Sequence, residues 1–365
     1  MRAEDKSKKG YRDMFIFVKT EILRVPADPR FQGGRMVKEY IAKRIIYALI
    51  TLYVVTTLNF VFFQVLSPID PITMYLGPRG GSIITPEKKQ EMVARFGLND
   101  SLSARYVRYT VNTFTFKFGF SLKTGLPVAY ELSMRIGPTV LLGGLALVIT
   151  PILGVLLGAM AASRRGSKID LLAIAGGLFA WGVPSFFVQI IVLLVFGVIL
   201  GWFPTVGFVD VPAPVWPSFE FIAQVAAHLA LPLAALVVHG IGFFSLYTRN
   251  MMLDTFTEDY IVTARAKGLK ERTVVYKHAL RAVLPPVFTM FVIYLPSVLW
   301  FVMMAEIVFA WPGIGNWFFV AAIEGDFPTV QAIVFLFAII IIVGNFVTDL
   351  LYMYLDPRIR VGRKG

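Results

Sequence analysis

The sequence predicts an all-α integral membrane protein, with six transmembrane helices and a long, partly helical external loop between the first two. Three observations predict this fold class. Of the 365 residues, 57% are hydrophobic and 16% are charged, whereas soluble domains usually carry roughly 25% charged residues. The apolar residues gather into runs longer than the roughly 18 residues that indicate a spanning helix. The basic residues flank these runs, as the positive-inside rule requires.

Six apolar segments are each long enough to cross about 30 Å of hydrocarbon as a helix that rises about 1.5 Å per residue. They cover residues 45–66, 138–162, 171–200, 221–246, 286–309 and 330–355. The third segment is overlong and contains Pro184. It is therefore expected to be one kinked or tilted span, or two short helices.

These segments divide the chain into five parts. They are a cytoplasmic N-terminal extension (1–37), the first transmembrane helix (38–66), the external loop (67–137), a five-helix core (138–355) with a cytoplasmic loop at 249–285, and a cytoplasmic tail (356–365). The orientation follows from lysine and arginine, which are absent from the connections 201–220 and 311–329 and crowd the opposite connections. Both termini are therefore predicted to be cytoplasmic.

The external loop carries helix signals of its own. Thr85-Pro86-Glu87 is typical of a helix start, Gly97 of a stop, and residues 103–113 form a second helical stretch. A loop of this length exceeds what a connection needs. We expect a lid or docking role, with a plain connection as the alternative. The N-terminal extension predicts either a short amphipathic helix on the membrane or a tail, and no function is assigned to it.

Several kinds of chemistry are excluded or disfavoured. The chain has no cysteine, and its three histidines lie in separate regions, so no metal site is expected. It lacks a G-x-x-x-x-G-K-[ST] phosphate loop and the G-x-S-x-G and H-E-x-x-H motifs. We therefore expect neither an enzyme nor a cofactor in this chain. The net charge of +12 reflects membrane topology and does not indicate nucleic acid binding.

The loop between the fourth and fifth helices has a helix–glycine–helix pattern. Asp259 suits a helix N-terminus, and Tyr260, Ala264 and Lys267 recur at helical spacing. Gly268 then breaks the helix, and a second, basic helix follows over residues 269–281. Such a projection offers a compact surface to a cytoplasmic partner, although any basic cytoplasmic loop also satisfies the positive-inside rule.

The run Thr-Ala-Arg-Ala-Lys-Gly at residues 263–268, followed by Lys-His-Ala-Leu-Arg at 277–281, resembles the EAA loop of ABC importer permeases. It is similar to the form found in the oligopeptide/dipeptide (Opp/Dpp) permease family. Val262 and Leu280-Arg281 depart from the general EAA pattern, as they do in this branch. The resemblance implies that the loop inserts a coupling helix into each cytoplasmic ATPase. The implied coupling residues are Asp259, Tyr260, Thr263, Ala264, Arg265, Ala266, Lys267, Gly268, Leu269 and Arg272.

Further matches extend the resemblance from about residue 38 to the C-terminus. They lie at Arg44 and at residues 118–121, 182–186, 305–309, 311–315 and 356–360. Lys117 stands where the family usually has an acidic residue.

The resemblance implies a channel-forming subunit of an ATP-driven importer in the inner membrane. Such a subunit moves peptides or di- and oligosaccharides into the cytoplasm from an extracytoplasmic binding protein. The implied partners are a second homologous permease, two ATPases that carry ATP and magnesium, the binding protein and membrane lipid. The alternative, a secondary transporter driven by an ion gradient, is disfavoured by the few charges inside the spans and the lack of an internal repeat.

Residues within the spans provide candidates for the translocation path or gate, since ionisable groups there are costly and often functional. They are His239, Trp300, Phe301, Glu306 and Asp349. The alternatives are structural: a hydrogen-bonded packing role for His239, a buried partner of backbone groups or arginine for Glu306, and an ion pair of Asp349 with Arg358 or Arg360. Trp300 and Phe301 lie in the middle of the fifth span, where a place in the interfacial belt does not explain them, and flat aromatic surfaces suit sugars or peptide side chains.

Overall fold

The computed structural model describes residues 34–66, 100–210, 213 and 215–355. Regular structure within these ranges is helical, apart from an isolated bridge between Phe120 and Pro127. The all-α fold class is therefore confirmed. The expected helix between Thr85 and Gly97, most of the N-terminal extension and the tail lie outside the described residues.

The chain divides into two compact units. The first, Met1–Ile46 with Leu350–Gly365, contributes the beginning of helix α2 (Gly34–Phe60) and the end of helix α14 (Phe327–Leu355). The second, Tyr47–Asp349, contains all the other described elements. Each statement below concerns this second unit by itself.

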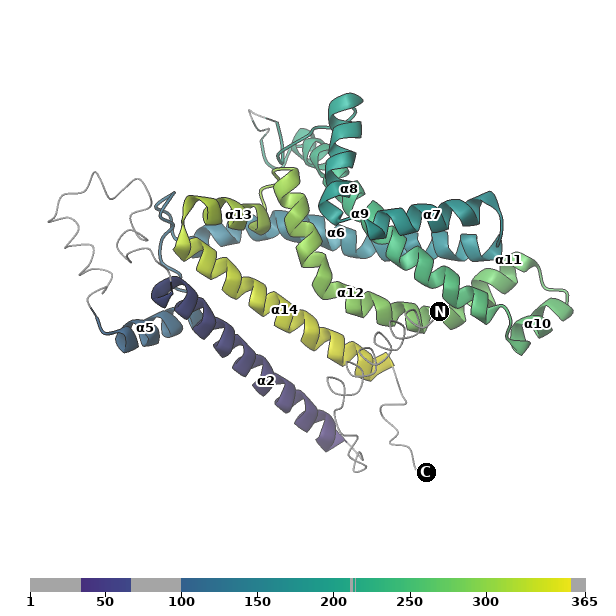
Figure 1. The fold of residues 1–365 in the computed structure, drawn as a ribbon, viewed down its shortest axis with the longest axis horizontal. Coiled ribbons are helices and arrows are strands. Elements are labelled where there is room, and N and C mark those ends of the chain that lie inside the picture. Colours follow the sequence, from purple (N-terminus) through teal and green to yellow (C-terminus); the bar gives the residue numbers. More distant parts are fainter. Residues whose placement is uncertain (1–33, 67–99, 211–212, 214, 356–365) are drawn as a thin grey trace, which may run out of the picture. The chain divides into compact units, whose positions relative to one another are not determined.

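Within it, α2 continues into a π-helical turn and the remaining helices follow in sequence order (Figure 1). They are η2 (Val61–Val65), α5 (Leu102–Phe114), α6 (Val128–Ser163), α7 (Lys168–Gly182), α8 (Ser185–Val192), η3 (Leu193–Ile199), α9 (Phe219–Thr255), α10 (Asp259–Ala266), α11 (Glu271–Thr273), η4 (Val274–Ala279), α12 (Leu280–Val308), α13 (Ile314–Glu324) and α14. Helices α10 and α11 lie toward one end of this unit and α13 toward the other (Figure 1).

The described helices provide five candidate membrane spans, and a sixth if one bent pair of helices counts as a single span. Five are long and apolar enough to cross a membrane: α2 with η2, α6, α9, α12 with the turns that precede it, and α14. The sixth is the pair α7 and α8–η3, which meet at 109°. Val183 at the break is extended, with φ −86° and ψ 138°, because the proline that follows disfavours helical geometry at this residue. The third predicted segment is thus two helices joined at Pro184.

Several helices extend beyond their apolar runs. Helix α6 begins at Val128, ten residues earlier than the predicted span, and its first turns hold Glu131 and Arg135 one turn apart. Helix α9 continues to Thr255, so the first residues of the predicted loop at 249–285 are helical. The predicted connection at 311–329 contains an additional helix, α13. Sequence hydropathy detects the apolar part of a helix, whereas its ends are set by pairing and capping.

Helices α6 and α9 approach closely through two glycines of α6. A Cβ atom on Gly154 would lie 2.5 Å from Phe244 Cβ, and one on Gly158 would lie 2.4 Å from the Ser245 carbonyl oxygen. The two glycines are four residues apart and therefore share one helix face. This is the small-residue pattern that lets membrane helices pack backbone to backbone.

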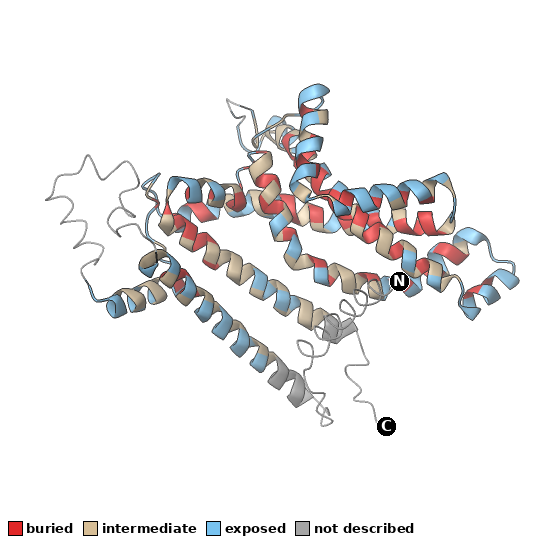
Figure 2. Cartoon of the chain, in the orientation of Figure 1, coloured by how far each residue is buried: buried red, intermediate tan, exposed pale blue. Residues whose placement is uncertain are grey.

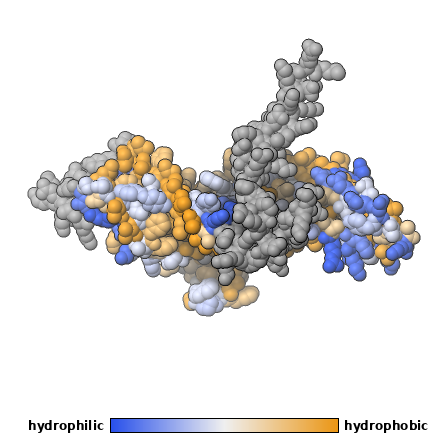
Figure 3. Space-filling view, turned by 90° about the horizontal axis from the view of Figure 1, so that it is seen from below, coloured by the Kyte–Doolittle hydropathy of each residue, from blue (hydrophilic) through white to orange (hydrophobic). Residues whose placement is uncertain are grey.

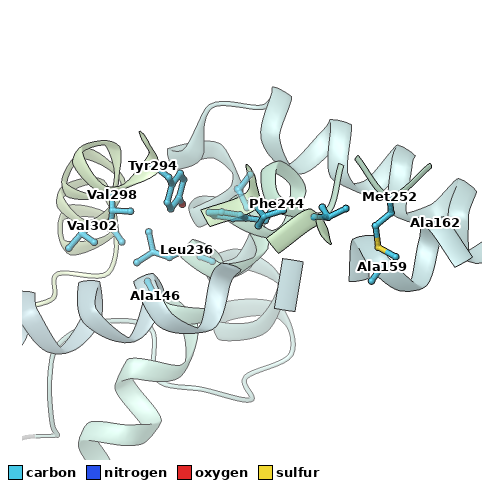
Figure 4. Packing of buried hydrophobic residues seen from close by; sticks show 14 of the residues in the cluster. Ala146, Ala159, Ala162, Leu236, Phe244, Met252, Tyr294, Val298 and Val302 are labelled. Carbon is cyan, nitrogen blue, oxygen red and sulfur yellow. The ribbon is translucent and has the colours of Figure 1, made fainter. Parts of the chain in front are cut away.

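The main core lies between α6, α9 and α12, which each bury one side (Figure 2). Leu236 and Phe244 of α9 pack between alanines of α6 and the residues Tyr294, Val298 and Val302 of α12 (Figure 4). The rings of Phe244 and Tyr294 meet edge to face, with centroids 5.2 Å apart. The same core continues to α10 and η4 through Ile261 and Val275.

Candidate functional site

The predicted helix–glycine–helix pattern is present at the end of the molecule that carries α10. Helix α10 runs from Asp259 to Ala266, and α11 begins at Glu271. Between them Gly268 has φ +75°, a backbone conformation that glycine adopts without the steric cost of a Cβ atom. The chain thus reverses at the residue where the sequence predicts the break.

One side of α10 is packed against its own chain. Ile261 and Ala264 are buried and belong to the main core, together with Val274, Val275 and Ala279 of η4. Of the residues predicted to share a face, Ala264 is buried beside Ile261, whereas Tyr260 and Lys267 are exposed. The other nine implied coupling residues are exposed: Asp259, Tyr260, Thr263, Arg265, Ala266, Lys267, Gly268, Leu269 and Arg272.

The turn around Gly268 is closed by a two-pronged ion pair. Arg265 Nη2 lies 2.7 Å from Glu271 Oε1, and Arg265 Nε donates to Glu271 Oε2 at 3.2 Å. This pairing raises the pKa of Arg265 above its usual value. The guanidinium also lies over the ring of Phe256, 5.3 Å from its centroid. The turn is thus held in place before any partner binds.

The surface at this end is polar and basic. Hydrophilic side chains gather over the end that carries α10 and α11 (Figure 3). A shallow hollow follows α11, η4 and the start of α12, with basic groups beside apolar ones. Its lining is Arg272, Thr273, Tyr276, Lys277, Leu280, Arg281 and Leu284. An exposed turn beside a basic hollow can bind a partner with an acidic or polar cleft.

His239 lies in the interior of the bundle. Its Nδ1 is 2.8 Å from the Ala180 carbonyl oxygen. Its ring packs against Trp181 and Phe301, with centroids 5.3 and 4.8 Å away. These contacts fit the packing alternative, and they place His239 beside the break between α7 and α8.

The neighbours Trp300 and Phe301 point in different directions. Phe301 joins the aromatic group of Trp181, His239 and Tyr294. Trp300 lies outside this group, and 63% of its surface is exposed. The structure thus brings Phe301 and His239 together and separates Trp300 from both.

Glu306 is fully buried near the end of α12. Its Oε2 accepts hydrogen bonds from the backbone amides of Gly315 at 2.6 Å and Asn316 at 3.2 Å. These amides belong to the first turn of α13, where helical amides have no partner within the helix. Thr139 Oγ1 of α6 accepts from the Ile314 amide at 2.9 Å. Glu306 therefore caps α13. This contact fits the structural alternative for Glu306, in which its carboxylate is a buried partner of backbone groups.

Asp349 lies half-buried on α14. Its predicted partners Arg358 and Arg360 lie outside the described residues. The adjacent Thr348 donates to the Val292 carbonyl oxygen at 3.3 Å and joins α14 to α12.

Three buried carboxylates, Glu131, Asp170 and Asp326, escaped sequence reasoning. Asp170 in the first turn of α7 binds the guanidinium of Arg249, with Arg249 Nη2 2.9 Å from Asp170 Oδ2. The signal that could have found Asp170 is its position three residues after the N-cap Ser167. Asp326, between α13 and α14, is also buried. Within the described residues, no cluster of His, Cys, Asp and Glu is suited to a metal ion.

A bundle of long apolar helices with a preformed polar turn at one end defines a multi-pass membrane protein that can receive a soluble partner. Residues 154–361 match the family described as binding-protein-dependent transport system inner membrane component. Residues 36–125 match the N-terminal part of such membrane components. The chain belongs to the family of binding-protein-dependent transport system inner membrane components.

Three curated relatives indicate which branch of this family the chain resembles. The chain is 34% identical to the oligopeptide transport system permease protein AppB of Bacillus subtilis, over 88% of this chain and 98% of that protein. It is 33% identical to the di/tripeptide permease protein DppB of Pseudomonas aeruginosa, and 31% identical to the dipeptide permease protein DppB of Escherichia coli K12, with the same coverage. The resemblance to the Opp/Dpp permeases is confirmed, and an ion-driven transporter is not favoured.

Proposed function

We propose that this chain is the channel-forming subunit of an ATP-driven importer whose substrate is a peptide. The observation that carries the proposal is the exposed α10–Gly268–α11 turn, held by the Arg265–Glu271 pair. Peptides are favoured over sugars because the relatives AppB and DppB are named for oligopeptides, di/tripeptides and dipeptides.

The packing of the turn supplies a route for mechanical coupling. Ile261 and Ala264 of α10 press on η4, and η4 runs without a break into α12. A push on the exposed side of α10 therefore reaches a membrane-spanning helix directly. Closure of two ATPases bound at this turn and at its counterpart in a second permease would tilt α12. The two sides of the path would then open alternately by a rigid-body movement.

The orientation and the partners follow from the same assignment. The α10 end is cytoplasmic, as are both termini, and the α13 end faces an extracytoplasmic binding protein. ATP and magnesium are held by the ATPases. The exposed Trp181 at the end of α7 and the half-buried Phe301 of α12, whose rings are in contact, are the best candidates to line the path. Trp300 is exposed on α12 and suits a contact with the second permease.

The test is purification of the tagged chain from its native membrane, with mass spectrometry of its partners and an assay of ATP hydrolysis. We expect two ATPases and a second permease. Gly268→Asp should leave membrane insertion intact and abolish peptide uptake coupled to ATP. The matched control is Gly201→Asp, because Gly201 also has a positive φ and open space around it. Equal uptake by both variants would remove the coupling assignment, and a chain without ATPases would remove the importer.

The substrate class is tested with the same complex in vesicles. We expect peptide to stimulate ATP hydrolysis when the cognate binding protein is present. Stimulation by di- or oligosaccharides in place of peptides would contradict the peptide assignment and leave the coupling assignment intact.

A further inference from the structure

The α13 end of the molecule has a hydrophobic cluster separate from the main core. It joins the beginning of α6, the helix α13 and the beginning of α14. Its buried members are Val128, Leu132, Ile314, Trp317, Ala332 and Ile333. Phe118, from the segment that precedes α6, packs against it. The segment 118–126, which belongs to no helix, therefore reaches this cluster through Phe118.

A single buried carboxyl group ties this segment to the helices. Asp326 Oδ2 accepts hydrogen bonds from Ser121 Oγ at 2.5 Å and Thr329 Oγ1 at 2.8 Å, and Oδ1 accepts from the Leu122 amide at 3.1 Å. Asp326 is 1% exposed. Both oxygens are thus occupied, and two of the three donors come from a segment about 200 residues earlier in the chain.

The segment itself forms a compact turn around Ser121. The Ser121 amide donates to the Leu126 carbonyl at 2.9 Å, and the Val128 amide to the Gly119 carbonyl at 3.0 Å. Ser121 Oγ also accepts from the Lys123 and Thr124 amides at 3.2 Å. An exposed ion pair, Lys123 with Glu324, lies outside this network. Ser121 therefore joins the turn to Asp326 through one hydroxyl group.

We infer that Asp326 is a positioning residue that fastens residues 118–126 to α13 and α14, so that all three move as one body during transport. This inference rests on the proposed function, because its first test measures peptide uptake. The physical reason is that separation would leave a buried carboxyl group without its donors and expose Phe118, both of which are unfavourable. The movements that open the path to alternate sides of the membrane must then occur between other helices of the bundle.

The first experiment asks whether the segment separates from α13 in the transport cycle. The chain has no native cysteine, so Lys123→Cys with Glu324→Cys gives a single thiol pair at an exposed contact. The pair is joined by a short, cleavable bifunctional thiol reagent in the complete transporter. We expect peptide uptake to stay within about twofold of the unjoined double variant. A loss of about tenfold or more that cleavage restores would overturn the inference.

The uptake of the unjoined double variant separates this inference from the proposed function. If that variant takes up peptide with ATP, the proposed function holds and the joined form tests the one-body movement alone. If neither that variant nor the parent chain takes up peptide with ATP, the proposed function fails. The labelling experiment below then decides the role of Asp326 without any transport.

The second experiment measures the fastening itself, in membranes, by the rate at which maleimide labels Leu122→Cys, a half-buried site. Asp326→Asn should raise this rate about tenfold, because an amide keeps only one of the two acceptor oxygens. Ser121→Ala, a milder change, should raise it less. The matched control Lys123→Ala, which removes the exposed ion pair, should leave the rate within about twofold. An unchanged rate in both Asp326→Asn and Ser121→Ala would overturn the inference.

Discussion

The two ends of α12 are attached to the rest of the chain in opposite ways. At its start, α12 is continuous with η4, and the adjoining turn is closed by Arg265 and Glu271, which are six residues apart and 41% and 56% exposed. At its end, the chain reverses beyond Phe309, and the buried carboxyl group of Glu306 caps α13. The ion pair near the start is local and solvated, whereas the hydrogen bonds at the end are buried and shared with α6.

This difference suits two mechanical roles. Exposed charge pairs contribute little to stability because water screens them, so a partner can break the Arg265–Glu271 pair at small cost. Buried groups that lose their partners are expensive. The end of α12 should therefore carry α13 with it whenever it moves.

The largest effect is expected from Glu306→Ala. This change removes the acceptor of the Gly315 and Asn316 amides inside the bundle. We expect a loss of about 2–5 kcal/mol in the free energy of unfolding, since buried donors are left unpaired. Thermal unfolding of the purified protein in detergent measures it. Glu306→Gln, which keeps one acceptor oxygen, is the control and should lose less. Equal stability of Glu306→Ala and the parent protein would refute the capping role.

Gly313→Ala should have the next largest effect. A Cβ atom there would lie 2.0 Å from Glu306 Oε1, while the backbone at φ −93° is accessible to alanine. Overpacking should therefore cost about 1–3 kcal/mol through displacement of the carboxyl group alone. Unfolding of Gly144→Ala provides the comparison, because a Cβ atom on Gly144 meets nothing within 4 Å. The argument fails if the two alanine variants are equally stable.

A smaller loss is expected from Trp311→Phe. The indole Nε1 of this buried residue donates to the Pro138 carbonyl of α6 at 3.0 Å. Phenylalanine keeps the aromatic packing and removes the donor, which should cost about 1 kcal/mol. Trp300→Phe tests the same chemical change at an exposed position and should leave the unfolding temperature unchanged. A matching loss in Trp300→Phe would show that the hydrogen bond is not the cause.

The contrast between the two ends also explains what the sequence could predict. The break at Gly268 and the bend at Pro184 depend on the backbone preferences of single residues, so both are visible locally. Glu306, Asp170 and Asp326 bind groups 9, 79 and 205 residues away, and such contacts exist only once the helices are packed. Helix α13, of 11 residues, is too short for a hydropathy window to identify as a span. Helical spacing groups Ala264 with Tyr260 and Lys267, but spacing alone does not say that Ala264 meets the core.

The smallest effect on stability is expected from Glu271→Gln at the exposed end. Loss of the pair with Arg265 should change the free energy of unfolding by no more than about 1 kcal/mol, because both side chains are in contact with water. In the complete transporter, however, the released Arg265 no longer closes the turn around Gly268, so substrate-stimulated ATP hydrolysis should fall although the chain remains folded. Thermal unfolding and the ATPase assay on one preparation separate these outcomes. A stability loss as large as that of Glu306→Ala would mean that the turn is part of the core, and the division between the two ends of α12 would have to be abandoned.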